Sequence, residues 1–195
     1  GHMNYDQTDS SLVFAGIDDN QHLIFTKFLN SAATADLKIQ STASFNATRI
    51  NIKRSINGNF YYGSFGDINS HYFFKLDSAF NFVFCTGFTL SGISNDKTTT
   101  VEELTNGDFI GLNEGAVVRL NANGLIKWVK ALPYFGFQSL RGLKILNGSK
   151  FLILGDIYRG VSVSNRQDVF ICCMDTSAQI LWSKSLGSDA VELAN

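Results

Sequence analysis

The chain has 195 residues and a formal net charge of -1, with 45% hydrophobic and 17% charged residues. This composition excludes a disordered chain. The near balance of charge argues against nucleic-acid binding and membrane-surface binding, since both need a basic surface. No apolar run reaches the roughly 18 residues of a membrane helix, so we expect no membrane insertion.

The predicted elements, taken in chain order, are strands and tight turns. Residues 1–3, Gly1-His2-Met3, are typical of an expression tag and are excluded. From there on, one pattern recurs: an apolar residue, then Asp or Asn, then an aromatic seven residues later. Because Asp and Asn bond their own backbone, each copy predicts a strand, a turn and a second strand. In the best-formed copy Gly124 supplies a positive φ. The copies are 17–25, 76–84, 120–128 and 174–182.

A second pattern interleaves with the first. Asn-Gly pairs stand between apolar runs at 57–58, 106–107 and 147–148, and this is the strongest short-range hairpin signal. The Asp or Asn anchors at 18, 77, 121 and 175 are 59, 44 and 54 residues apart. Two hairpins in a repeat of this length make a four-stranded blade. The predicted fold is therefore all-β, a β-propeller or partial propeller of about 3.5 to 4 four-stranded antiparallel blades.

The third and fourth copies carry a family resemblance. The segments Leu120-Asn121-Ala122-Asn123-Gly124-Leu125-Ile126-Lys127-Trp128 and 174–182 resemble the repeat of delta-60-type propellers. They are more distantly similar to quinoprotein-type propeller repeats. The resemblance spans roughly residues 11 to 195 and implies a propeller fold. It does not imply a function, because propellers host many unrelated activities.

The repeats divide a single domain over 4–195 into blades. Complete blades are predicted at 48–90, 100–132 and 139–187. The segments 11–29 and 189–195 would supply only a hairpin and a first strand. Open blade edges invite association, so three arrangements stay open. The termini share one blade in a four-bladed ring, the chain is a fragment of a longer propeller, or two chains pair into one.

The strand order predicts where a function would lie. In an up-down blade all tight turns lie on one face and all long connections on the other. The long connections are expected at 30–47, 65–71, 88–99, 133–138 and 156–168. Because loops on a rigid scaffold carry function more often than tight turns do, the long-loop face is the predicted binding face.

Two connections supply the candidate binding residues. The first places the aromatics Tyr134, Phe135 and Phe137 in a short loop, as anchors for a partner or a sugar ring. The alternative interpretation is packing between blades. The second connection supplies Asp156, Tyr158 and Arg159 as polar contacts. Asp67 and Asp156 occupy equivalent positions, and they either bind a cation or polar ligand or cap their loops.

The sequence gives no catalytic constellation. His22 and His71 are the histidines outside the tag, and they lack metal-ligand spacing. The three cysteines, Cys85, Cys172 and Cys173, are interpreted as small core residues. An adjacent-cysteine disulfide over a quinone cofactor is the enzymatic alternative for the last two. We expect no catalytic residues, no metal and no cofactor.

The predicted function is a non-enzymatic binding module for a protein or glycan partner, without nucleic acid. The alternatives are a structural scaffold that forms homo-oligomers through incomplete blades, and a non-catalytic fragment of a larger propeller enzyme. The location stays open, with a secreted or cell-surface one slightly favoured over the cytoplasm. The glycosylation-type triplets at Asn46 and Asn147 are too common by chance to decide it.

Overall fold

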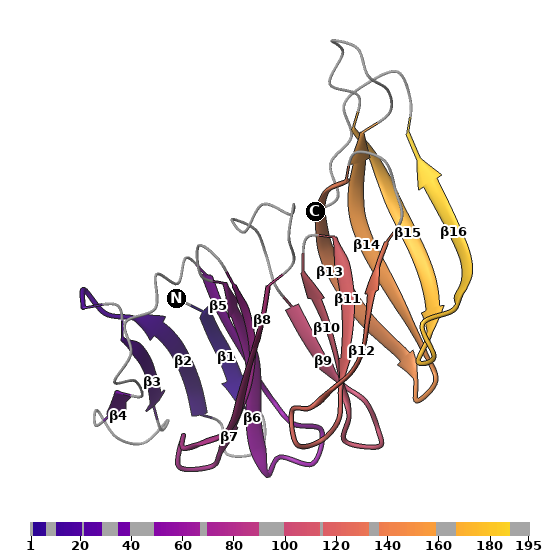
Figure 1. Cartoon of the computed structure of the whole chain (residues 1–195). Helices are drawn as coiled ribbons and strands as arrows, with labels where there is room; N and C mark the ends of the chain where they lie inside the picture. The colour runs from indigo at the N-terminus through magenta and orange to yellow at the C-terminus, as the bar shows by residue number, and fades with distance from the viewer. Residues whose placement is uncertain are drawn as a thin grey trace. The chain divides into compact units, whose positions relative to one another are not determined.

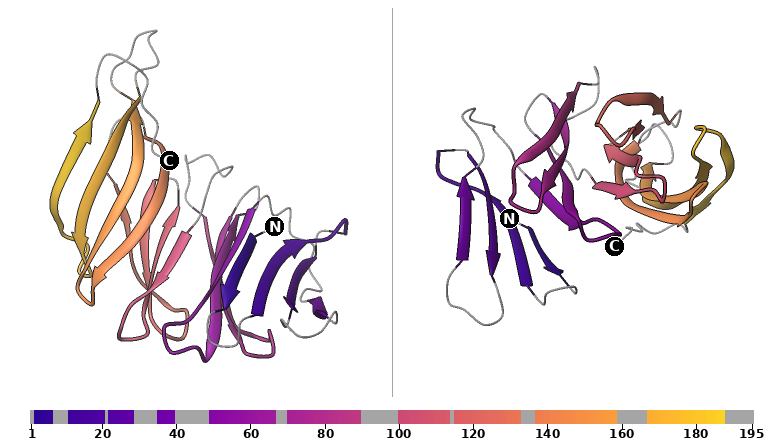
Figure 2. Two further views of the ribbon diagram at one scale, coloured as in Figure 1. Left: turned by 180° about the vertical axis from the view of Figure 1, so that it is seen from behind. Right: turned by 90° about the horizontal axis from the view of Figure 1, so that it is seen from below.

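The repeat seen in the sequence folds into four sheets in the computed structural model (Figures 1 and 2). The structure describes residues 2–6, 11–20, 22–28, 35–39, 49–66, 70–89, 100–113, 115–132, 137–158 and 167–187. Over these residues the fold is all-β. The chain forms two compact units, 1–99 and 100–195, and each is described by itself. The described residues contain no helix long and apolar enough to cross a membrane.

Each unit holds two four-stranded antiparallel sheets in which the strands follow one another in chain order. The first sheet contains β1 (His2–Asp6), β2 (Ser11–Ile17), β3 (Leu23–Phe28) and β4 (Ala35–Ile39). The second contains β5 (Arg49–Arg54), β6 (Phe60–Gly66), β7 (His71–Asp77) and β8 (Phe82–Phe88). The third contains β9 (Thr100–Glu103), β10 (Phe109–Asn113), β11 (Ala116–Leu120) and β12 (Ile126–Ala131). The fourth contains β13 (Phe137–Asn147), β14 (Lys150–Tyr158), β15 (Gln167–Asp175) and β16 (Ile180–Leu186). This up-down order is the architecture of a propeller blade, as the sequence predicted.

A hydrophobic core lies between the two sheets of each unit. In the first unit, Phe25 of β3 packs edge-on against Phe74 of β7, with ring centroids 5.6 Å apart, and also contacts Phe80. In the second unit, Ile110, Phe151 and Cys172 belong to one buried cluster. Strand β10, an inner strand of the third sheet, is buried at every position.

The Asp and Asn anchors form the same turn in all four copies, which confirms their predicted role. The side-chain Oδ1 of Asp77 accepts hydrogen bonds from the backbone N–H of Ala79 and Asn81, at 2.9 and 2.8 Å. Asp18, Asn121 and Asp175 accept the equivalent pairs. Gly124 has φ +81°, as predicted, and the same turn position forces Phe80 and Ala178 to φ 60° and 70°. The anchor side chain therefore holds the turn even where glycine is missing.

The first sheet differs from the prediction. A hairpin alone was expected over 11–29, but β1 and β4 flank β2 and β3 and complete a four-stranded sheet. The Asp18 turn consequently joins the second and third strands, whereas the other three anchor turns join the third and fourth. Strand β1 includes His2 and Met3, the residues assigned to a tag. The expectation that all tight turns lie on one face is therefore wrong for the Asp18 turn, because the added strands place it between the second and third strands of its sheet.

The other sheets lie close to the predicted blades. The second, third and fourth sheets span residues 49–88, 100–131 and 137–186. The predicted first strand of a further blade, residues 189–195, lies outside the described residues. The assignment of residues 4–195 to one propeller-like domain stays a prediction.

Candidate functional site

The predicted binding residues divide into those that the structure describes and those that it does not. Tyr134, Phe135 and Arg159 lie outside the described residues. Phe137 begins β13 and Tyr158 ends β14, and their side chains are also outside the description. Asp156 was expected in a loop, but it lies within β14 and its side chain is fully buried. The paired part of β14 and β15 extends to Tyr158 and Gln167, so Asp156 belongs to a strand and not to the connection that was predicted to begin there.

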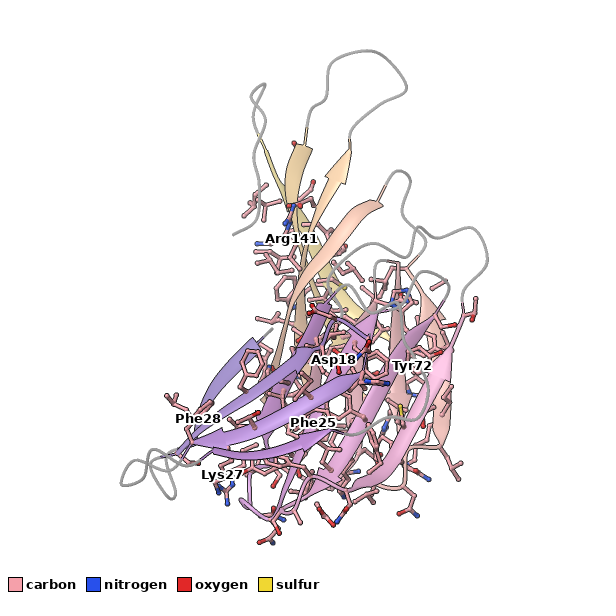
Figure 3. All side chains as sticks on the ribbon, turned by 90° about the vertical axis from the view of Figure 1, so that its left-hand side faces the viewer. Asp18, Phe25, Lys27, Phe28, Tyr72 and Arg141 are labelled. Atoms are coloured by element: carbon pink, nitrogen blue, oxygen red, sulfur yellow. The ribbon has the colours of Figure 1, made fainter. Side chains whose placement is uncertain are left out.

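Asp156 binds an arginine that the sequence analysis did not select. Arg141 Nε contacts Asp156 Oδ2 across β13 and β14. Arg141 is the extra residue of a β-bulge, since Leu140 pairs with Gly155 and Gly142 pairs with Leu154. A bulge re-aims a side chain out of the regular ladder. Here it lets Arg141 reach the buried carboxylate while 43% of its own side chain stays exposed (Figure 3).

A second buried carboxylate lies at the same end of the sheet. Asp168, the second residue of β15, pairs with Ile157 and is fully buried. Its Oδ1 lies 1.9 Å from where a side chain on Gly187 would begin, so only glycine fits there. The loop end of sheet β13–β16 therefore combines two buried carboxylates with one half-exposed guanidinium. Asp67, the proposed equivalent of Asp156, lies outside the described residues.

Arg141 had one signal in the sequence. It precedes Gly142 inside an otherwise apolar strand pattern, and an isolated glycine in a strand favours a bulge. The register shift at Leu140/Gly142 is that bulge. Its ion pair with Asp156 spans 15 residues and has no sequence signature.

The cysteines and histidines occupy ordinary structural positions. Cys85, Cys172 and Cys173 are unbridged. Cys172 and Cys173 are buried, as expected of small core residues, whereas Cys85 on β8 is exposed, so that interpretation is wrong for Cys85. Burial raises the pKa of the Cys172 thiol to about 11, and Cys173 adds to the effect. His71 is fully buried, with its ring centroid 5.8 Å from that of Phe88. His22 closes the first anchor turn, since its Nδ1 lies 3.0 Å from Asp18 Oδ2. The hydrogen bond from the His22 backbone N–H is the main cause of the lowered pKa of Asp18.

The described side chains include no group of three His, Cys, Asp or Glu residues placed to hold a metal ion.

A cluster of charged residues lies at the opposite, tight-turn end of the second unit. Asp108 is 6% exposed and accepts hydrogen bonds from Arg119 at 2.6 Å and Lys127 at 2.7 Å. Arg119 also donates to the carbonyl of Thr176 in the fourth sheet, at 2.6 Å. The cluster ties the third sheet to the turn of the fourth, so we interpret it as a structural brace.

Comparisons with known proteins support the fold alone. No family model matches the sequence, and no curated protein is detectably similar to it. Among solved structures, a protein of unknown function from Bacteroides caccae is similar, with a TM-score of 0.51 and 8% sequence identity. The match covers 96% of this chain and 81% of the other. At this identity the likeness concerns the arrangement of strands and not the activity.

Proposed function

We propose that the chain is a non-enzymatic interaction module that binds a protein or glycan partner at the loop end of sheet β13–β16. The observation that carries this proposal is the half-exposed Arg141, positioned by a bulge and braced by the buried Asp156. An arginine held in this way loses little conformational freedom on binding, so its contacts are more favourable. Arginine is also enriched among the residues that dominate binding energy.

The chemistry of Arg141 sets what it recognises. A guanidinium has five N–H donors in a planar fork, which matches a carboxylate, and its face stacks on rings. Among the described residues it contacts Asp156 through Nε, which leaves the Nη donors for a partner. An acidic peptide or a uronic-acid sugar supplies the matching carboxylate. The predicted aromatics Tyr134, Phe135 and Phe137 and the polar residues Tyr158 and Arg159 are the proposed surroundings of this contact.

The finer family assignment belongs to the same proposal. We infer that the blades are of the delta-60 or quinoprotein-like repeat type, on the basis of the Asp or Asn anchor and the aromatic that follows it. The turn hydrogen bonds common to Asp77, Asn121 and Asp175 support one repeat type. A scaffold role is the second candidate. It is favoured by large apolar side chains, such as Phe28 on the first sheet and Trp182 on the fourth, that are exposed.

Arrays of acidic peptides and of uronic-acid oligosaccharides are the probes that test the proposal. We expect the wild-type chain to bind a subset of one array. Arg141→Lys keeps the charge beside Asp156 but removes the fork, so affinity should fall about ten-fold. Lys150→Met, which removes an exposed positive charge at the tight-turn end of the same sheet, is the matched control and should bind normally. Equal binding by wild type and Arg141→Lys, or no binding by wild type to either array, would refute the proposed site.

A further inference from the structure

The contact between the third and fourth sheets shows how one blade covers another. Trp128 on β12 donates its Nε1–H to the Thr176 carbonyl in the β15–β16 turn, at 3.1 Å. Trp128 also packs against the core cluster of the unit. Leu132, four residues further on, is 5% exposed. The turn of the fourth sheet thus contacts and partly covers Trp128 of the third sheet.

The fourth sheet has a corresponding face, but its tryptophan and its last leucine are exposed. Trp182 pairs with Cys173 as Trp128 pairs with Arg119, so the two tryptophans hold equivalent positions. Trp182 is 45% exposed, and its indole N–H donates to none of the described residues. Leu186, the equivalent of Leu132, is 52% exposed. We call this surface the fourth-sheet outer face: Leu152, Leu154, Val169, Ile171, Cys173, Trp182, Lys184 and Leu186.

The first sheet has an exposed apolar face as well. Val13, Ala15, Leu23 and Phe25 are buried in the core shared with the second sheet. Side chains alternate along a strand, so the residues between them lie on the opposite face. Leu12 and Phe28 there are 44% and 45% exposed, and Phe14 and Ile24 are half-buried (Phe28 in Figure 3). We call Leu12, Phe14, Ile24 and Phe28 the first-sheet outer face.

We propose that the fourth-sheet outer face docks on the first-sheet outer face of a second copy of this chain. The contact continues the row of blade-on-blade packing already formed by Trp128 and Thr176. Every copy carries both faces, and the proposed arrangement is the mutual one, in which two copies each cover the other's outer face.

The charges on the fourth-sheet outer face oppose pairing with itself. Lys184 pairs with Ile171 and Lys144 pairs with Leu152, so both lysines belong to this side of the sheet. Asp156 pairs with Val169 on the same side, but its charge is already matched by Arg141. Two copies of the same face would bring like charges together, which is unfavourable at an interface. The first-sheet outer face, by contrast, presents apolar side chains among its described residues, so it can cover the fourth-sheet outer face without that repulsion.

Size-exclusion chromatography with light scattering tests the proposal on the whole chain. We expect a mass of about twice 21.5 kDa at micromolar concentration. Trp182→Ser and Phe28→Ser each alter an exposed side chain on one of the two faces. Both should weaken the dimer at least about ten-fold, because large buried anchors dominate interface energy. Leu125→Ser, at a 67% exposed turn position, is the matched control and should stay dimeric.

Three results would overturn the proposal. The first is a wild-type chain that stays monomeric at high micromolar concentration. The second is a Phe28→Ser variant that stays dimeric while Trp182→Ser dissociates, because this would mean that the fourth-sheet outer face pairs with itself. The third is dissociation of Leu125→Ser to the same degree as the face variants. Circular dichroism of each variant establishes that a lost dimer reflects the contact and not unfolding.

Discussion

Replacing Asp108 with asparagine should strongly destabilise the second unit. Its carboxylate is 6% exposed and neutralises Arg119, which is 16% exposed, and Lys127, which is 44% exposed. Removing one partner of a buried ion pair costs about 3–5 kcal/mol, because the remaining charge is left without compensation. Lys127 regains hydration, since nearly half of it is exposed, and Arg119 keeps its bond to Thr176. We therefore expect Asp108→Asn to lower the free energy of unfolding by about 2–3 kcal/mol.

Urea denaturation followed by tryptophan fluorescence measures this change selectively. Both tryptophans, Trp128 and Trp182, lie in the unit 100–195, so their emission reports its unfolding. The matched control is Lys127→Met, which removes the exposed end of the same cluster and should cost less than about 1 kcal/mol. A loss below about 0.5 kcal/mol for Asp108→Asn, or equal losses for the two variants, would refute the view that Asp108 is the centre of the brace.

Three further predictions concern pH and backbone fit. Burial alone would raise the pKa of Asp108, but the hydrogen bonds and charges of Lys127 and Arg119 outweigh it and lower the pKa. The stabilisation is therefore complete above the unfolded carboxyl pKa of about 4 and is lost as the pH falls through the lower folded value. In urea titrations the wild-type free energy of unfolding should fall from neutral to acidic pH. The fall should be much smaller in Asp108→Asn, which lacks this carboxylate. Gly63→Ala should cost more than about 2 kcal/mol by thermal melting, because its Cβ would lie 2.0 Å from the Asn51 carbonyl oxygen. A melting temperature equal to wild type would contradict the tight strand packing. Gly107→Ala should cost about 1 kcal/mol in the fluorescence titration, since φ is +82° and the nearest atom leaves room for a methyl group. An unchanged free energy of unfolding for Gly107→Ala would show that the backbone of this turn adjusts to accept alanine.

The sequence predicted most of the fold because the repeat has a local cause. Asp77, Asn121 and Asp175 bond backbone groups two and four residues ahead, so the turn depends on nearby residues alone. The position of the first sheet in the repeat was not predictable in the same way. The Asp18 turn has the same local bonds, and pairing with β1 and β4 decides which strands it joins.

The candidate site was predictable only in part. Asp156 was selected from a repeated Gly-Asp-Ile segment, but its burial and its partner depend on the strand β13 next to it. Arg141 is far from Asp156 in sequence and reaches it through a bulge, so no local pattern connects them. The exposed outer faces were missed for a similar reason. Trp182 and Trp128 hold the same position in the repeat, and their burial differs because the turn of a following blade contacts Trp128.

Acrylamide quenching of tryptophan fluorescence tests whether the aromatic of each blade has to be covered by a following blade. The variant Trp128→Phe leaves Trp182 as the sole tryptophan, and Trp182→Phe leaves Trp128. We predict that acrylamide quenches Trp182 strongly in dilute solution and weakly at high protein concentration, where a second copy covers it. Trp128 should be protected at every concentration. Equal, concentration-independent quenching of Trp182 and Trp128 would contradict the account.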